Sequence, residues 1–282
     1  MDISQPNSIR LDQYLSDKEP GSSRNQLSKL ISSGQVSVNG QVVNKSGFKL
    51  KSKDKVSYVL KENKQNLKKL TPKILYEDED CVVIEKPLGI LSHSKGDYLD
   101  EETVASWLSS KIQDIEGNRA GIVHRLDRGT SGVMICAKNL ETQKWLQKQF
   151  STRKTKKTYI AVVEGKLNPE NAIVDMAIER NPKKPQTFRV GINGKSAITK
   201  YETIKSNDKY SLIRLTPLTG RTHQLRVHLA NLNHPIYGDD LYGASKADRL
   251  YLHANKLELT LNNRKRMEFV SKVPASFNKI FK

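Results

Sequence analysis

The chain has 282 residues, of which 36% are hydrophobic and 28% are charged, and its formal charge at pH 7 is +18. This length provides one large or two ordinary domains with a sizeable core, and no segment approaches the roughly 18 uncharged apolar residues of a membrane span. The N-terminus lacks the basic-then-apolar pattern of a secretory signal. The two cysteines, Cys81 and Cys136, are too few for a disulfide framework or a CxxC zinc cluster. We therefore expect a cytoplasmic protein in a reducing compartment.

Residues 8–60 form the first predicted unit. A helix is predicted at 23–34 from an N-cap serine, apolar residues with i, i+3, i+4 spacing and a closing glycine. Asn39-Gly40 lies between alternating valines in segment 36–43, which predicts a β-hairpin with a two-residue turn. Segment 55–60 predicts a further strand.

The second predicted unit is residues 73–282, after a polar and basic segment at 61–72 that we interpret as a linker. Its apolar patterns predict two strands within 73–86, further strands at 131–138, 157–165, 196–204 and 210–218, and helices at 103–112, 139–150 and 223–233. Strands outnumber helices and do not alternate with them strictly. We therefore predict an α+β fold with a mixed, mainly antiparallel sheet, preceded by a small N-terminal α/β domain.

Basic residues are spread over both units. They cluster at 45–55, 153–157, 183–184 and 264–266. Patches distributed in this way favour a long polyanion over one small anionic metabolite, so the charge predicts a nucleic-acid partner. A surface that is basic only for solubility is the alternative. The GxGxxG and GxxxxGK[ST] motifs are absent from the sequence, so nucleotide-phosphate chemistry has no support.

Segment 124–132, HRLDRGTSG, is the densest in chemically active residues and lies between two apolar stretches. Arg125 and Arg128 stand close to Asp127, and cations beside a carboxylate favour its ionised form. An ionised, positioned carboxylate can act as a nucleophile. An ordinary turn with an Asp–Arg ion pair is the alternative, and composition alone favours it.

Segment 218–226, LTGRTHQLR, opens a predicted helix that Thr219 or Thr222 can cap. Arg221 then lies at the helix N-terminus, where free N–H groups and the helix dipole favour anions. Its guanidinium can fork onto Asp127 or onto a phosphate. A capped helix with a solvated arginine explains the same pattern.

Single aromatic and imidazole side chains complete the candidates. Tyr159 opens a predicted strand, where a tyrosine can stack on a base or relay a proton, although a core tyrosine is more common. His223, His228 and His234 follow one another at spacings of five and six, which does not place them on one helix face. We therefore expect no metal site.

Taken together, the motifs resemble the RluA family of pseudouridine synthases. Segment 124–132 is similar to the catalytic loop of that family, and the opening KPxG motif and the later motifs are matched at 86–89, 157–165, 215–239 and 250–259. The resemblance covers roughly residues 73–280. Separately, residues 8–60 resemble the S4-type RNA-binding domain, notably in SRNQLSKLISSGQVSVNG.

The resemblance implies roles for three catalytic residues. Asp127 is expected to be the nucleophile that attacks the target uridine, either at ribose carbon 1′ or on the base. Arg221 is expected to pair with Asp127 and to hold it ionised. Tyr159 is expected to pack on the extruded uracil and to help move the proton from carbon 5.

The resemblance also implies where RNA is bound. In the catalytic unit Arg125 is expected to fill the gap left by the extruded nucleotide, with His124 assisting. The expected RNA-binding residues of both units are His124, Arg125, Arg128, Arg24 and Lys29. Extruding the base costs a few kcal/mol, which contacts between basic residues and phosphates can offset.

Pseudouridine formation is an isomerisation, so we expect neither cofactor nor metal. A lone carboxylate with an arginine partner is sufficient, whereas a hydrolytic glycosidase brings a second carboxylate. The S4-type domain favours large-subunit ribosomal RNA, or a pre-ribosomal particle, because family members that act on transfer RNA often lack it. We expect a monomer with no membrane partner. Transfer RNA as the substrate, a non-catalytic ribosome-assembly factor and a nucleic-acid glycosylase are the alternatives.

Overall fold

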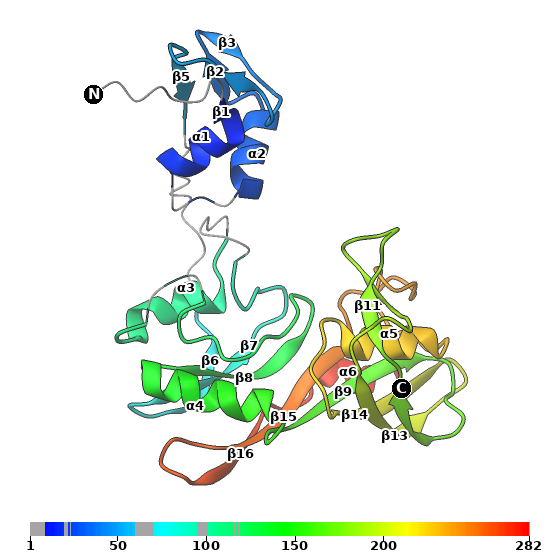
Figure 1. Ribbon diagram of the computed structural model, residues 1–282. Coiled ribbons are helices and arrows are strands. Elements are labelled where there is room, and N and C mark those ends of the chain that lie inside the picture. Colours follow the sequence, from blue (N-terminus) through cyan, green and yellow to red (C-terminus); the bar gives the residue numbers. More distant parts are fainter. Residues whose placement is uncertain are drawn as a thin grey trace. The chain divides into compact units, whose positions relative to one another are not determined.

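The computed structural model describes residues 9–19, 22, 24–59, 70–94, 101–115, 117 and 119–281. These residues belong to two compact units (Figure 1), one comprising 1–69 with 94–102 and the other 70–93 with 103–282. Most of the predicted linker lies outside the described residues. The domain bounds 8–60 and 73–282 therefore stay predictions. No helix in the described ranges is long and apolar enough to cross a membrane.

The first unit packs two helices against short strands. Its elements are β1 Ile9–Arg10, α1 Leu11–Lys18, α2 Arg24–Ser32, β2 Val36–Val38, β3 Gln41–Val42, β4 Lys49–Leu50 and β5 Val56–Tyr58. Asn39 and Gly40 connect β2 to β3 with φ of 52° and 81°, the left-handed values that a two-residue hairpin turn requires. The predicted hairpin is therefore confirmed, and β5 pairs with β2 as its third strand. Helix α1 was not among the elements predicted from the sequence.

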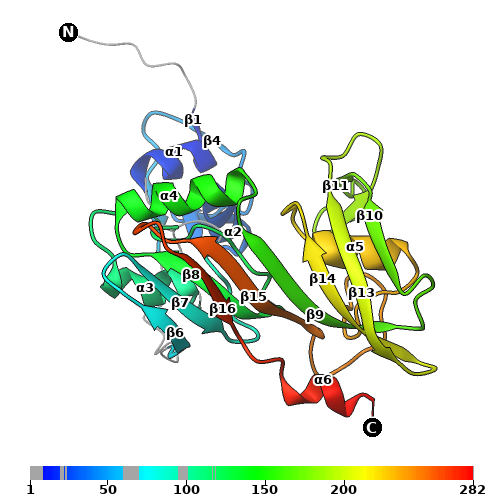
Figure 2. The same ribbon diagram turned by 90° about the horizontal axis from the view of Figure 1, so that it is seen from below.

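The second unit is built on one nine-stranded sheet (Figure 2). Its strands are β6 Lys73–Glu77, β7 Cys81–Lys86, β8 Ser131–Ala137, β9 Lys156–Glu164, β10 Asn171–Asp175, β13 Ile198–Ser206, β14 Tyr210–Pro217, β15 Leu252–Thr260 and β16 Arg266–Val270. The order is β10-β13-β14-β9-β15-β8-β7-β6, with β16 on β15. Among the described strands only the β15–β8 pairing is parallel. The predicted mixed, mainly antiparallel sheet is confirmed.

The helices of this unit divide between the two halves of the sheet (Figure 2). They are α3 Val104–Leu108, α4 Leu140–Ser151, α5 Gln224–Asn231 and α6 Ala275–Lys279. Leu146 of α4 packs in a core with residues of β7, β8 and β15. Leu225 and Leu229 of α5 pack in a separate core with residues of β9 and β14. The loop that follows Ile122 and precedes β8 meets the first turn of α5, where Arg226 donates to Asp127.

The parallel contact between β8 and β15 explains one glycine of segment 124–132. Gly132 has φ of 118°, and a Cβ atom there would lie 2.2 Å from the carbonyl oxygen of Ala254. Only glycine permits this approach of the two backbones. The strands β11 Ile178–Arg180 and β12 Phe188–Val190 form a separate hairpin that the sequence patterns did not indicate.

Candidate functional site

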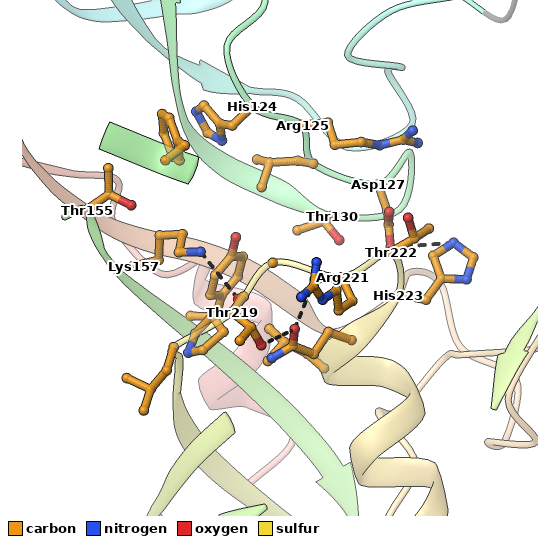
Figure 3. A pocket seen from close by; sticks show the side chains of 18 of the residues that line it. His124, Arg125, Asp127, Thr130, Thr155, Lys157, Thr219, Arg221, Thr222 and His223 are labelled. Carbon is orange, nitrogen blue, oxygen red and sulfur yellow. Dashed lines mark hydrogen bonds and ion pairs between the residues drawn. The ribbon is translucent and has the colours of Figure 1, made fainter. Parts of the chain in front are cut away.

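A cavity of about 550 Å³ lies where segments 123–130 and 217–226 meet (Figure 3). The start of β9 and the end of α4 complete its wall. Small-molecule sites commonly enclose about 300–1,000 Å³, so the cavity is large enough for a nucleoside. The two segments singled out in the sequence, which are far apart along the chain, thus line one cavity.

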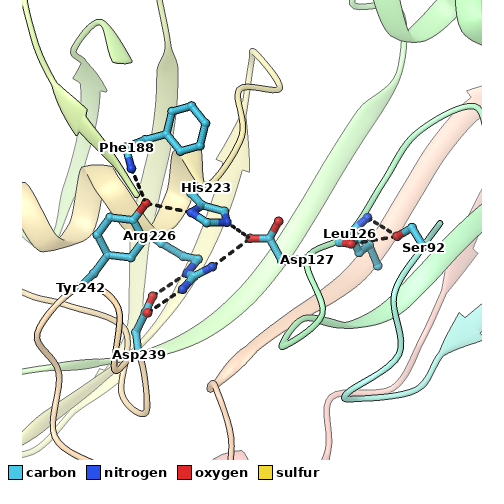
Figure 4. Close-up of polar contacts among 8 residues, drawn as sticks. All are labelled: Ser92, Leu126, Asp127, Phe188, His223, Arg226, Asp239 and Tyr242. Carbon is cyan, nitrogen blue, oxygen red and sulfur yellow. Dashed lines mark hydrogen bonds and ion pairs between the residues drawn. The ribbon is translucent and has the colours of Figure 1, made fainter. Parts of the chain in front are cut away.

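Asp127 faces this cavity and is held from the α5 side (Figure 4). Its Oδ2 accepts a hydrogen bond from the guanidinium of Arg226 at 3.3 Å. The same oxygen lies 3.8 Å from Nε2 of His223. About one fifth of the Asp127 side chain (19%) stays exposed, so a ligand in the cavity can reach the carboxylate.

Arg226 is itself fixed by a second carboxylate behind the cavity. Its Nε and its other terminal nitrogen donate to the two oxygens of Asp239 at 2.6 and 2.7 Å, in a bidentate fork. Burial lowers the pKa of Arg226, but the hydrogen bonds and charge of Asp239 and the charge of Asp127 outweigh that effect, so its pKa is raised. Removing one partner of a buried charge pair typically costs about 3–5 kcal/mol of stability. Arg226 is therefore a rigid donor toward Asp127.

The expected ion pair between Arg221 and Asp127 is not formed, which corrects the prediction. Nε of Arg221 donates to the carbonyl oxygen of Ser196 at 3.0 Å, and its backbone N–H donates to Gln224. Arg221 lies in the turn before α5, whereas Arg226 lies in the first turn of the helix and points back to the loop. Arg221 remains on the cavity wall.

Tyr159 lies at the floor of the site, on β9, and contacts the cores of both halves of the sheet. Burial and, to a smaller extent, the charge of Asp127 raise the pKa of its hydroxyl. The side chain is therefore a protonated phenol that lines the cavity. Lys157, two residues earlier on the same strand, also lines the cavity and donates to the carbonyl oxygen of Thr219 at 3.4 Å.

The ring of His124 anchors the loop to β8 and α4. Its Nε2 accepts the backbone N–H of Ile135 at 3.1 Å, and its ring stacks on Phe150 with centroids 4.5 Å apart. Burial and the nearby charge of Lys157 lower the pKa of His124 to about 3. The ring is therefore neutral and acts as an acceptor within the fold, although it also touches the cavity.

The other predicted RNA-binding residues are distributed differently. Arg125 and Arg128 are exposed, and Arg125 lines the cavity. Lys29 is exposed on α2 of the first unit, and the side chain of Arg24 lies outside the described residues. Of the candidates in the second unit, all except Arg128 line the cavity.

Residues 86–92, at the end of β7 and after it, form a clamping segment that hydrogen-bonds to both sequence neighbours of Asp127. The hydroxyl of Ser92 donates to the carbonyl oxygen of Leu126 at 2.8 Å and accepts its N–H at 3.0 Å (Figure 4). The N–H of Gly89 donates to the carbonyl oxygen of Arg128 at 3.0 Å. The residue before Asp127 and the residue after it are thus tied to one segment.

Lys86 holds this clamping segment together. It is fully buried, and its ammonium donates to the carbonyl oxygens of Pro87 and Ile90 at 2.9 and 2.7 Å. Burial lowers the pKa of Lys86 to about 7, against the opposing charge of Asp127. The KPxG motif noticed in the sequence therefore builds the support of the loop.

Known proteins resemble the chain over both units. Residues 80–231 match the family described as RNA pseudouridylate synthase, and residues 9–56 match the S4 domain. The ribosomal large subunit pseudouridine synthase D of Borreliella burgdorferi is 37% identical over 96% of this chain and 88% of its own. An uncharacterized RNA pseudouridine synthase of Aquifex aeolicus is 38% identical over 83% and 77%. The solved structure titled human RNA pseudouridylate synthase domain containing 4 has a TM-score of 0.60 and 28% identity, covering 73% of this chain and 90% of that one.

The neutral state of His124 predicts an acid-sensitive fold. In the unfolded chain the pKa of a histidine is about 6.5, so between pH 6.5 and 3 the unfolded state binds a proton that the folded state does not. Stability therefore falls as the pH falls through this window. Between pH 6.5 and 4.5, the variant His124→Gln should lose about 2 kcal/mol less unfolding free energy than the wild type. Urea unfolding at both pH values measures this, and equal losses would contradict the assigned state of His124.

Proposed function

The chain belongs to the RNA pseudouridylate synthase family, and on this premise we propose that it converts specific uridines of large-subunit ribosomal RNA to pseudouridine. The observation that carries the proposal is the lone carboxylate. Among the described residues that line the cavity, Asp127 is the only acidic one. A hydrolytic glycosidase would usually present two.

The proposed reaction needs one nucleophile and one extruded base. The carboxylate of Asp127 adds either to carbon 1′ of the ribose or to the base, and the bond between carbon 1′ and N1 breaks. Carbon 5 of the turned uracil then bonds to carbon 1′, and the bond to Asp127 breaks, which regenerates the carboxylate. The proton on carbon 5 leaves and N1 takes up a proton. The composition of the nucleoside is unchanged, so the step consumes no second substrate.

Tyr159 and Arg221 are proposed to act on the bound nucleoside. The ring of Tyr159 offers a flat apolar face on which uracil can stack. Because its hydroxyl stays protonated, Tyr159 is better suited to donate a hydrogen bond than to accept the carbon 5 proton. Arg221, engaged through its Nε, keeps its terminal nitrogens available to bind a phosphate beside the target.

The substrate class rests on two observations. Relatives over 30% identical, from Borreliella burgdorferi and Pasteurella multocida, are both named ribosomal large subunit pseudouridine synthase D. The S4 match at residues 9–56 supplies a separate RNA-binding unit. Transfer RNA is the alternative substrate. A cytoplasmic location, action on a pre-ribosomal particle and a monomeric state stay predictions.

Replacing the nucleophile should stop the reaction. With ribosomal RNA carrying tritium at carbon 5 of uridine, wild-type protein should release label, and Asp127→Asn should release it at least about 1,000-fold more slowly. Free uracil among the products would identify a glycosylase instead. Equal release by both proteins would show that Asp127 is not the nucleophile.

The hydrogen bonds between Ser92 and Leu126 predict that replacing Ser92 lowers the reaction rate as well as the stability of the fold. Ser92→Ala removes both hydrogen bonds to Leu126, so the carboxylate of Asp127 is positioned less precisely. The turnover number should therefore fall roughly 10–100-fold. The matched control is Ser211→Ala, because the hydroxyl of Ser211 is equally buried and donates to the carbonyl oxygen of Gly165 at 2.7 Å, outside the cavity. Both variants should lose about 1–3 kcal/mol of unfolding free energy. If both kept the wild-type turnover number, the clamp would have no catalytic role.

Removing the first unit should affect binding more than chemistry. A chain lacking residues 1–65 loses basic residues that neutralise phosphates, so its affinity for ribosomal RNA should fall. The dependence of log affinity on log salt should also become less steep. Filter binding at several salt concentrations measures both quantities, and tritium release at saturating RNA measures the remaining turnover. An unchanged affinity would refute the role of a separate RNA-binding module.

A further inference from the structure

The residue that opens helix α5 adopts a backbone conformation that is unusual for its type. His223 has φ of 56° and ψ of 17°, in the left-handed region. For a residue with a Cβ atom this conformation is sterically unfavourable. Strained residues of this kind are concentrated at functional sites, where the surrounding structure holds them in place. The conformation points the imidazole of His223 toward Asp127 (Figure 4).

The imidazole of His223 joins Asp127 to a tyrosine. Its Nε2 lies 3.8 Å from Oδ2 of Asp127, and its Nδ1 lies 2.8 Å from the hydroxyl oxygen of Tyr242. The backbone N–H of Phe188 donates to that hydroxyl oxygen at 3.0 Å. A polar chain therefore runs from the β11–β12 hairpin through Tyr242 and His223 to the carboxylate.

The donors and acceptors of this chain fix one tautomer of His223. The N–H of Phe188 already donates to the hydroxyl oxygen of Tyr242, so the hydroxyl proton is directed toward Nδ1 of His223, which then accepts it. Burial raises the pKa of Tyr242, in keeping with this assignment. An ionised carboxylate can only accept hydrogen bonds, so Nε2 must carry a proton for a favourable contact with Asp127. Both requirements select the neutral ring with its proton on Nε2. Burial also lowers the pKa of His223, against the charge of Asp127.

The ring contacts hold the group in one arrangement. His223 meets Tyr242 edge-on at 5.7 Å and Phe188 at 5.6 Å between ring centroids. The guanidinium of Arg226 lies 5.0 Å from the centre of the Tyr242 ring. Tyr242 therefore touches both groups that approach Asp127.

We propose that His223 is a second positioning residue for Asp127, and that the hydroxyl of Tyr242, held by the β11–β12 hairpin, fixes the tautomer that lets it act. The inference rests on the proposed function. The 3.8 Å separation shortens to a hydrogen bond when the nucleoside is bound, since catalytic hydrogen bonds are often long before the substrate arrives. The loop between β11 and β12, the hairpin that carries Phe188, contains the exposed Lys183 and Lys184.

The first test removes one hydroxyl and leaves its ring. Tyr242→Phe keeps the ring contacts but removes the hydroxyl beside Nδ1 of His223, so the proton of the imidazole is no longer held on Nε2. The matched control is Tyr201→Phe, because the buried hydroxyl of Tyr201 donates to the carbonyl oxygen of Pro169 at 2.9 Å, outside the cavity. On tritium-labelled ribosomal RNA, Tyr242→Phe should lower the single-turnover rate at saturating protein about 10-fold. Its affinity for the RNA, by filter binding, should stay within about twofold of wild type, and Tyr201→Phe should match the wild type in both measurements.

The second test restores the donor in another form. His223→Asn tolerates the left-handed backbone but its amide is too short to reach Asp127, whereas the amide nitrogen of His223→Gln can take the place of Nε2. The Gln variant should react about 10-fold faster than the Asn variant at equal RNA affinity. Equal rates for these two, or a Tyr242→Phe rate equal to that of Tyr201→Phe, would overturn the inference. No release by the wild type would instead overturn the proposed function.

Discussion

The guanidinium of Arg226 lies between two carboxylates, and the site depends on this contact. Asp239 is buried and takes two of the nitrogens, while Asp127 faces the cavity and takes the third. A buried arginine with a single carboxylate would leave part of its fork unsatisfied. The pair with Asp239 therefore fixes the direction in which Arg226 donates, and Asp127 accepts the remaining hydrogen bond.

The remaining hydrogen bonds that position Asp127 come from the half of the sheet that carries β7 and β8. The segment from Lys86 to Ser92 ties the residue before Asp127 and the residue after it through backbone hydrogen bonds. Together with the hydrogen bond from Arg226, these contacts hold Asp127 from both halves of the sheet, the half that carries β7 and β8 and the half that carries α5. Each half has its own core. The arrangement suits the role proposed for Asp127, a nucleophile that stays in place while a base is extruded and turned.

Sequence patterns predicted those features of the fold that residues close together in the chain determine. The turn at Asn39-Gly40 was predictable because two left-handed residues in succession specify the hairpin. The mixed, mainly antiparallel sheet followed from the balance of strands and helices. The charges of segment 124–132 singled it out but were equally explained by an ordinary turn, and only the resemblance to a family assigned it a role. The match of residues 80–231 supports the family.

The partners of Asp127 were not predictable in the same way. Arg221 and Arg226 stand in one short segment, and which of them reaches Asp127 depends on where α5 begins and on the position of Asp239, more than a hundred residues beyond the loop. Arg226 follows Leu225 and precedes Val227, so the apolar pattern gives no sign that it is buried in a fork. His223 was considered only as a metal ligand, because its contact with Tyr242 is set by tertiary packing. The parallel pairing of β8 with β15 is non-local for the same reason.

The most direct test of this account is the single-turnover rate of Arg226→Lys on labelled ribosomal RNA. A lysine ammonium is a point charge that cannot reproduce a planar fork onto Asp239 while also reaching Asp127. We expect a rate at least about 100-fold below wild type, with cooperative unfolding and RNA affinity retained. Arg214→Lys, which alters an exposed ion pair with Glu202, should react at the wild-type rate. A folded Arg226→Lys protein as fast as Arg214→Lys would contradict the central role of the buried guanidinium.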